Sequence, residues 1–184
     1  MMKVFLVGLP GSGKTTLGKL LSKLMSMDFY DLDDEIEISE GRSINDIFRD
    51  KGEVYFREKE KFHLDRLIKL DKNIIISTGG GTPVFHNNMD SINKAGISVF
   101  IDITPQLAAQ RIYHSEKKAR PMVKDLSEEQ VVHKVKELYT FRIPFYSQAT
   151  LSFKTGNKDS SIFAGEIKKA ILNHLDKIGR NIRF

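Results

Sequence analysis

The amino-acid sequence predicts an α/β fold in a single domain over residues 1–184, with a parallel β-sheet covered by helices on both faces. Short, continuously apolar segments alternate with longer segments of helical periodicity, and no linker or internal repeat interrupts them. The segments with the character of strands are residues 3–7, 28–31, 73–77, 97–102 and 150–154. Such strands predict a doubly wound sheet, which binds ligands at the carboxyl ends of its strands.

The composition excludes several classes of protein. The sequence contains no cysteine, which excludes disulfide bonds and thiolate metal sites. No segment approaches the roughly 20 apolar residues that cross a membrane, so we expect a cytoplasmic protein that binds no membrane. The net charge of +5 comes from Lys and Arg scattered among Asp and Glu. This pattern favours small anionic ligands, and we expect a monomer that binds no nucleic acid.

The first strand leads into a phosphate-binding loop at residues 8–15, Gly-Leu-Pro-Gly-Ser-Gly-Lys-Thr, which completes the pattern G-x-x-x-x-G-K-[ST]. Its glycines let successive backbone N–H groups face a polyphosphate at the start of a helix. A glycine-rich turn would explain neither Lys14, which suits the β- and γ-phosphates, nor Thr15, which suits Mg²⁺. We therefore expect ATP or GTP to bind at Gly11, Ser12, Gly13, Lys14, Thr15 and Thr16.

The second strand ends in a cluster of aspartates. In an extended segment Asp31 and Asp33 would project to one side, toward the phosphate loop, where one carboxylate could hold Mg²⁺ and the other a hydroxyl group. Alternatively, Asp33 or Asp34 could cap the helix that follows. A rival metal ligand is Asp102, which ends a strand resembling Walker B, although the Thr-Pro that follows favours a role at the start of a helix.

Two segments lie outside the alternation of strands and helices. Residues 33–70 are a long, polar, helical insertion, and residues 115–126 are charged and poorly periodic. Such insertions often carry substrate binding and lids. Between them the third strand ends in Gly79, Gly80 and Gly81, which could form a tight turn but at this edge favour a close approach of the backbone to a substrate.

Three arginines occur in suggestive surroundings, namely Arg57, Arg120 and Arg142. Each could be an ordinary surface residue, and Arg57 could pair with Glu53 or Glu60 at helical spacing. Arginine is also the side chain best suited to hold a carboxylate with two parallel hydrogen bonds.

Together these motifs resemble those of shikimate kinases. The phosphate loop, the Asp-x-Asp pair, Gly-Glu-x-x-Phe-Arg ending at Arg57, the three glycines, Arg120-Pro121 and Arg142-x-Pro-x-Tyr146 occur in the order found in that family, over about residues 3–150. The resemblance implies a P-loop NTPase fold of three α/β/α layers with a five-stranded parallel sheet, related to nucleoside monophosphate kinases. It also implies a substrate-binding insertion at about 33–70 and a lid at about 112–125.

The resemblance further implies the activity and the roles of single residues. Members of the family use ATP to phosphorylate the 3-hydroxyl of shikimate, on the route to chorismate and the aromatic amino acids. The roles it implies are phosphate binding for Lys14, Mg²⁺ binding for Thr15 and Asp31, contact with the shikimate hydroxyls for Asp33, shikimate binding for Arg57, Arg142 and the glycines 79–81, phosphate contact from the lid for Arg120, and a place near adenine for Arg111. Lys14, Asp33 and Arg120 would be catalytic.

Two other functions remain open at this point. Another small-metabolite kinase on the same fold, such as a gluconate kinase, would share the phosphate machinery. A non-enzymatic nucleotide-binding module would keep the loop and need neither Asp33 nor Arg120.

Overall fold

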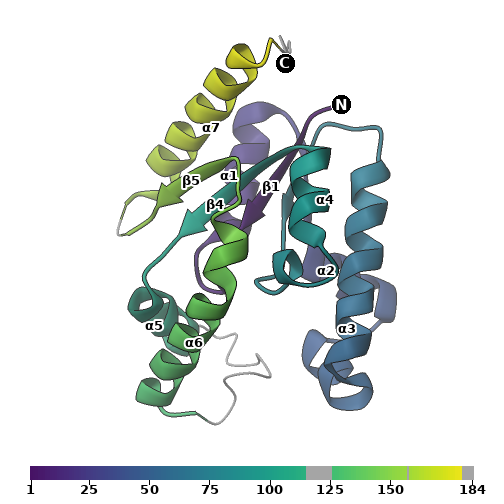
Figure 1. The fold of residues 1–184 in the computed structure, drawn as a ribbon, viewed down its shortest axis with the longest axis vertical. Helices are drawn as coiled ribbons and strands as arrows, with labels where there is room; N and C mark the ends of the chain where they lie inside the picture. The colour runs from purple at the N-terminus through teal and green to yellow at the C-terminus, as the bar shows by residue number, and fades with distance from the viewer. Residues whose placement is uncertain (115–125, 157, 180–184) are drawn as a thin grey trace.

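The structure is a computed structural model, and it describes residues 1–114, 126–156 and 158–179. In this part of the chain a central sheet lies between layers of helices (Figure 1). The sheet has five strands, paired in parallel in the order β2-β3-β1-β4-β5. They are β1 (Lys3–Val7), β2 (Asp28–Asp31), β3 (Ile74–Ser77), β4 (Ile97–Asp102) and β5 (Leu151–Lys154). The predicted sheet is confirmed, with β3 and β5 beginning one residue later than expected.

The central strands are apolar because both of their faces are covered. Every residue of β1 and β3 is buried, as is every residue of β4 except Asp102. The edge strands β2 and β5 are only partly covered and carry more polar residues. Continuous apolar runs are the pattern expected of parallel strands between two helical layers.

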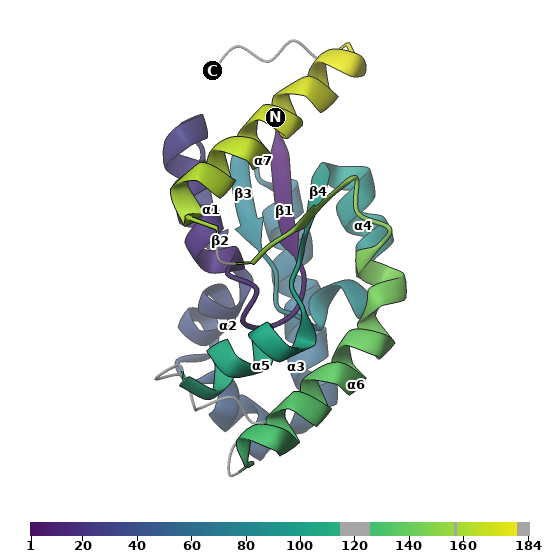
Figure 2. The same ribbon diagram turned by 90° about the vertical axis from the view of Figure 1, so that its left-hand side faces the viewer.

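The helices cover the two faces of the sheet in separate groups. Alternate side chains of β1 point to opposite faces, so Val4 and Leu6 join one buried cluster while Phe5 and Val7 join the other. In Figure 2, α1 (Lys14–Met25) and α7 (Ser160–Lys177) lie toward one side of the strands, and α4 (Asn88–Ala95) and α6 (Glu128–Tyr146) lie toward the other. The first cluster includes α1 and α7, and the second includes α2 (Leu32–Glu40), α3 (Ile44–Lys69), α4, α5 (Pro105–His114) and α6.

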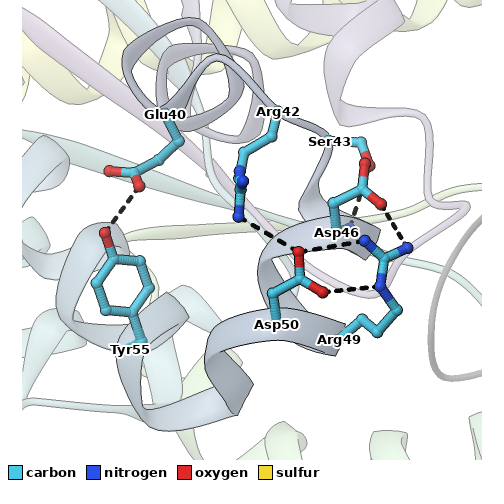
Figure 3. A network of polar contacts seen from close by, with 7 residues as sticks. All are labelled: Glu40, Arg42, Ser43, Asp46, Arg49, Asp50 and Tyr55. Carbon is cyan, nitrogen blue, oxygen red and sulfur yellow. Dashed lines mark hydrogen bonds and ion pairs between the residues drawn. The ribbon is translucent and has the colours of Figure 1, made fainter.

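The polar segment after β2 folds as the two helices α2 and α3, as its periodicity predicts. α3 bends at Gly52, where φ is 80°, a value that glycine adopts without strain. Arg42 forms an ion pair with Asp50 at 3.4 Å, and Tyr55 donates a hydrogen bond to Glu40 at 2.7 Å (Figure 3). These contacts join the end of α2 to α3 on both sides of the bend. The remaining members of the network in Figure 3 are Ser43, Asp46 and Arg49.

A short 3₁₀ helix (Thr82–Val84) follows the three glycines. α5 ends at His114, so most of the lid expected over residues 112–125 lies outside the described residues. Among the helices of the described segments, none combines the length and apolar character that a membrane span requires.

Candidate active site

The phosphate loop connects β1 to α1 at the carboxyl edge of the sheet. Gly8 has a φ of 143°, and a Cβ atom there would lie 2.6 Å from the carbonyl oxygen of Ile101, so only glycine fits. Gly13 precedes α1 in a left-handed conformation. The buried ammonium of Lys14 donates to the carbonyls of Gly8 at 3.0 Å and Leu9 at 2.9 Å. The loop therefore curls around a cation at the start of a helix, where anions bind favourably.

Asp31 joins this loop to the start of α2. The hydroxyl of Thr15 donates to Asp31 Oδ2 at 2.7 Å, and the backbone N–H of Asp33 donates to Asp31 Oδ1 at 3.1 Å. Two expectations are therefore wrong. Asp31 and Asp33 do not share an extended segment, because the helix begins at Leu32, and the cap is Asp31 instead of Asp33 or Asp34.

Asp33 nevertheless lies at the same edge of the sheet. A Cβ atom at Gly79 would lie 2.9 Å from Asp33 Oδ1. The first turn of α2 thus brings this carboxylate beside the end of β3, while Asp31 contacts the phosphate loop. Of the two aspartates expected to face the phosphate loop, Asp31 contacts it through Thr15, and the Asp33 side chain lies beside Gly79.

The glycine segment, Gly79–Gly81, makes room for charged side chains. A Cβ atom at its first residue would lie 2.6 Å from Glu60 Oε1, one at its second would lie 3.0 Å from Arg142 Nη1, and one at its third would collide with the guanidinium of Arg57. Larger residues at these positions would displace the charged groups. The glycines thus allow a close approach of the backbone to protein side chains, and the expected approach to a substrate stays a prediction.

Arg57 pairs with both expected partners, Glu53 and Glu60. The expectation of a surface ion pair is wrong, because the arginine is buried. Its guanidinium donates to Glu53 at 2.8 and 3.1 Å and to Glu60 at 2.5 Å, and it lies 4.4 Å from the ring centroid of Phe85. Burial alone would lower the pKa of Arg57, but Glu60 and Glu53 raise it above its ordinary value. Of the five guanidinium N–H groups, these bonds use three, and the other two have no hydrogen-bond partner in the described segments.

Glu60 is the residue of this site that sequence reasoning placed on the surface. It is 1% exposed and accepts hydrogen bonds from Arg57 Nη1 and from the hydroxyl of Thr82, each at 2.5 Å. A buried carboxylate is strongly unfavourable unless it is paired and hydrogen-bonded, and here it is both. In the sequence, the spacing of three residues between Arg57 and Glu60 was the one indication of this pair. That spacing fits an exposed ion pair as well as a buried one.

Arg142, on the last turns of α6, has a different environment. It is 4% exposed, and within the described residues no carboxylate forms an ion pair with it. Its guanidinium lies beside Gly80, since a Cβ atom at that glycine would lie 3.0 Å from Arg142 Nη1. A buried cation without a counter-charge is costly, and an anionic ligand would remove that cost.

Arg111, on α5, contacts the phosphate loop and the segment after β5. Its guanidinium donates to the carbonyl of Gly156 at 3.0 Å and to that of Gly11 at 3.4 Å. α5 is thereby joined both to the loop and to the segment after β5. Arg120, the expected lid arginine, lies outside the described residues.

Asp102 does not contact Thr15 and instead accepts a hydrogen bond from the hydroxyl of Tyr139 at 3.1 Å. The start of α5 is made by Thr104, whose hydroxyl accepts the backbone N–H of Leu107 at 3.3 Å. The carboxylate at the phosphate loop is therefore that of Asp31, as expected, and the rival Asp102 belongs to the packing between β4 and α6.

Comparison with protein families matches residues 10–175 to the shikimate kinase family. A shikimate kinase of Azobacteroides pseudotrichonymphae is 40% identical over 153 residues, which cover 83% of this chain and 89% of that relative. A shikimate kinase of Persephonella marina is 37% identical over 167 residues, which cover 91% and 97%.

Solved structures are similar over nearly the whole chain. A shikimate kinase from Acinetobacter baumannii in complex with shikimate has a TM-score of 0.87 and 32% identity, covering 95% of this chain and 94% of that one. The enzyme from Aquifex aeolicus has a TM-score of 0.79 and 35% identity, covering 94% and 98%. A gluconokinase from Sinorhizobium meliloti shares only the fold, with a TM-score of 0.60 and 13% identity. A phosphate loop, a loop-bound aspartate and two buried arginines thus meet at one edge of a sheet shared with these enzymes, and the chain belongs to the shikimate kinase family.

Proposed function

We propose that the chain transfers the γ-phosphoryl group of ATP to the 3-hydroxyl of shikimate and that Arg142 and Arg57 hold the shikimate carboxylate. The observation that carries this proposal is Arg142, which is 4% exposed and has no ion-pair partner in the described segments. A carboxylate ligand supplies the missing counter-charge and accepts two parallel hydrogen bonds from a guanidinium.

Arg57 supports the same carboxylate in a second way. Glu53 and Glu60 use three of its N–H groups and fix the direction of the remaining two. The glycine segment passes directly over this guanidinium. We infer that the carboxylate binds between the two arginines, with the backbone of Gly79, Gly80 and Gly81 beside it.

The phosphate loop and its neighbours would bind ATP. The ammonium of Lys14 now contacts the loop carbonyls at 2.9 and 3.0 Å, and anionic phosphate oxygens are stronger partners for it. Arg111, which donates to the carbonyls of Gly11 and Gly156, would lie near the adenine, as the resemblance implies. The resemblance implies that Arg120, on the lid, supplies a positive charge to the transferring phosphate.

The residues at Asp31 also fit a Mg²⁺ ion. The Thr15 hydroxyl and the Asp31 carboxylate are in direct contact at 2.7 Å, and oxygen ligands of this kind suit Mg²⁺. We propose that these two residues hold the ion. When bound, Mg²⁺ would neutralise charge on the phosphate oxygens.

Asp33 is the residue that we propose acts on the attacking hydroxyl. Its side chain lies beside Gly79, and its backbone N–H donates to the carboxylate of Asp31. We propose that it orients the hydroxyl and accepts its proton. A loose phosphoryl-transfer transition state requires little early deprotonation, so orientation is the larger part of this role.

An assay of ADP release with three separate acceptors tests the function. With ATP and Mg²⁺ present, we expect turnover with shikimate and none with gluconate or a nucleoside monophosphate. The variant Arg142→Met should lose the shikimate reaction, whereas Arg49→Met, at an exposed arginine of the network in Figure 3, should keep it. Turnover with gluconate alone would make the chain a different metabolite kinase, and ATP binding without any turnover would favour a nucleotide-binding module.

A further inference from the structure

Tyr146 is the last residue of α6 and is fully buried. Its hydroxyl donates to the carbonyl oxygen of Gly80 at 2.5 Å, and its ring lies 5.2 Å from that of Phe100. Burial raises the pKa of Tyr146 to about 12, although the nearby Arg142 opposes this rise. The hydroxyl therefore stays protonated and remains a hydrogen-bond donor at any pH at which the protein works.

The bond to Gly80 fixes one peptide group of the glycine segment. The described peptide bonds include no cis bond, and in a trans peptide the C=O of one residue points opposite to the N–H of the next. A carbonyl of Gly80 that points toward Tyr146 therefore turns the N–H of Gly81 away from the core. Within the described segments this N–H donates to no protein acceptor, so it is available to a ligand.

The carbonyls of Gly79 and Gly81 accept the backbone N–H groups of Thr82 at 3.2 Å and Val84 at 2.9 Å, whereas in the described segments the Gly80 carbonyl accepts from Tyr146. A Cβ atom at Gly80 would lie 2.7 Å from Pro10 Cδ and 3.0 Å from Arg142 Nη1, so the residue is confined on the side of the phosphate loop and of α6. Glycine itself imposes no preferred orientation on the peptide. The orientation of the carbonyl depends on its one strong partner, the hydroxyl of Tyr146.

We propose that Tyr146 is a positioning residue for the acceptor substrate: its hydroxyl orients the Gly80–Gly81 peptide so that the N–H of Gly81 donates to the shikimate carboxylate beside Arg142. This role rests on the proposed function. Tyr146 and Arg142 are one helical turn apart on α6, so a single helix end sets both the cation and the N–H that meet the anionic group.

The variant Tyr146→Phe tests the proposal because it keeps the ring and removes only the hydroxyl. We expect shikimate to bind about tenfold more weakly, with a matching rise in KM, since the peptide loses its orienting partner. The KM for ATP should stay within about twofold, because the phosphate loop is untouched. The matched control is Tyr139→Phe on the same helix, which removes the hydroxyl bonded to Asp102 and should leave the KM for shikimate unchanged.

Titration calorimetry separates positioning from folding. The stoichiometry of shikimate binding reports the folded fraction, and the dissociation constant reports the geometry of the site. A Tyr146→Phe protein with an unchanged dissociation constant, or one that yields no nucleotide-binding protein at all, would overturn the positioning role. If the wild-type chain and Tyr139→Phe both fail to phosphorylate shikimate, the proposed function fails instead, so the two failures are distinguishable.

Discussion

At the scale of single residues, the two buried arginines differ in how their charge is balanced. Arg57 is surrounded by Glu53 and Glu60, whereas Arg142 has no carboxylate partner in the described segments. The first is therefore oriented without a ligand, and under the proposed function the second would gain its counter-charge from the substrate carboxylate. Lysine can replace neither role well, because an ammonium lacks the planar arrangement of N–H groups.

Replacement of either arginine by lysine should weaken shikimate binding specifically. We expect Arg57→Lys and Arg142→Lys each to lose about 1.5–3 kcal/mol, the contribution of a hydrogen bond to a charged group, as a higher KM for shikimate. The KM for ATP should be little changed. Steady-state kinetics with each substrate varied in turn measures this, with Arg49→Lys as the exposed control. An unaltered shikimate KM in both variants would place the acid-binding site elsewhere.

Replacement of Asp33 by asparagine should affect turnover and not nucleotide binding. We expect kcat to fall about 10²–10⁴-fold, because the amide keeps the shape but can no longer accept the proton of the attacking hydroxyl. Calorimetry with ADP should give an affinity close to that of the wild type. Activity within a few-fold of wild type would reduce Asp33 to a structural residue of the first turn of α2.

The sequence could identify these residues better than it could describe their surroundings. The resemblance to shikimate kinases predicted one shared site for Arg57, Arg142 and Asp33, and all three side chains lie beside the glycine segment. The sequence could not show that Glu60 is buried, since helical spacing is the same for exposed and buried ion pairs. Burial depends on which element packs above the helix, and here that element is the glycine segment.

At the scale of elements, the pair α2 and α3 carries a buried histidine. His63 on α3 is 2% exposed, and neither ring nitrogen has a hydrogen-bond partner in the described segments. The charged groups around it are Arg66 and Lys59 of α3 with Glu35 and Glu40 of α2, and burial, followed by Arg66, lowers the pKa of His63 below its ordinary value. The helix pair therefore holds a neutral imidazole.

This histidine should make the protein less stable in mild acid. Because the pKa of His63 is lower in the folded chain, the unfolded chain binds the extra proton first, and stability is lost as the pH falls below about 6.5. One proton contributes at most about 1.4 kcal/mol per pH unit. We expect urea unfolding at pH 7.5 and 5.5 to show a smaller loss for His63→Leu than for the wild type. The exposed control His133→Leu should retain the wild-type loss, and equal losses in all three proteins would contradict the assignment.

The sequence predicted the strands almost to the residue but misjudged the start of α2. Strand positions follow from apolar runs that local periodicity reveals. The step from β2 into α2 depends on one side-chain bond, which the backbone N–H of Asp33 donates to the Asp31 carboxylate. An alternating pattern of aspartates fits a strand end and a helix start alike. The order of the strands lies beyond local patterns, because pairing joins segments distant in the chain.

At the scale of the whole molecule, groups from β2, α2, α3 and α6 converge with the phosphate loop at one edge of the sheet. Ligands that bind there stabilise the folded chain alone, by about 2.7 kcal/mol at a concentration one hundred times the dissociation constant. We expect ADP and shikimate each to raise Tm by several degrees. In Arg142→Met the rise with ADP should persist and the rise with shikimate should vanish, as differential scanning fluorimetry would show. A persistent shikimate shift in that variant would contradict the proposed site.

The isolated charge of Arg142 also implies a conflict between stability and recognition. An ion buried without its opposite is a form of electrostatic frustration, and an apolar residue of similar length would remove it. The free Arg142→Met protein should therefore unfold at a higher temperature than the free wild type while failing as an enzyme, and a lower Tm would show that the arginine supports the fold itself. A higher Tm would mean that the ligand-free protein is held below the stability that its architecture could reach, and that the proposed acidic substrate gains part of its affinity from relief of that strain.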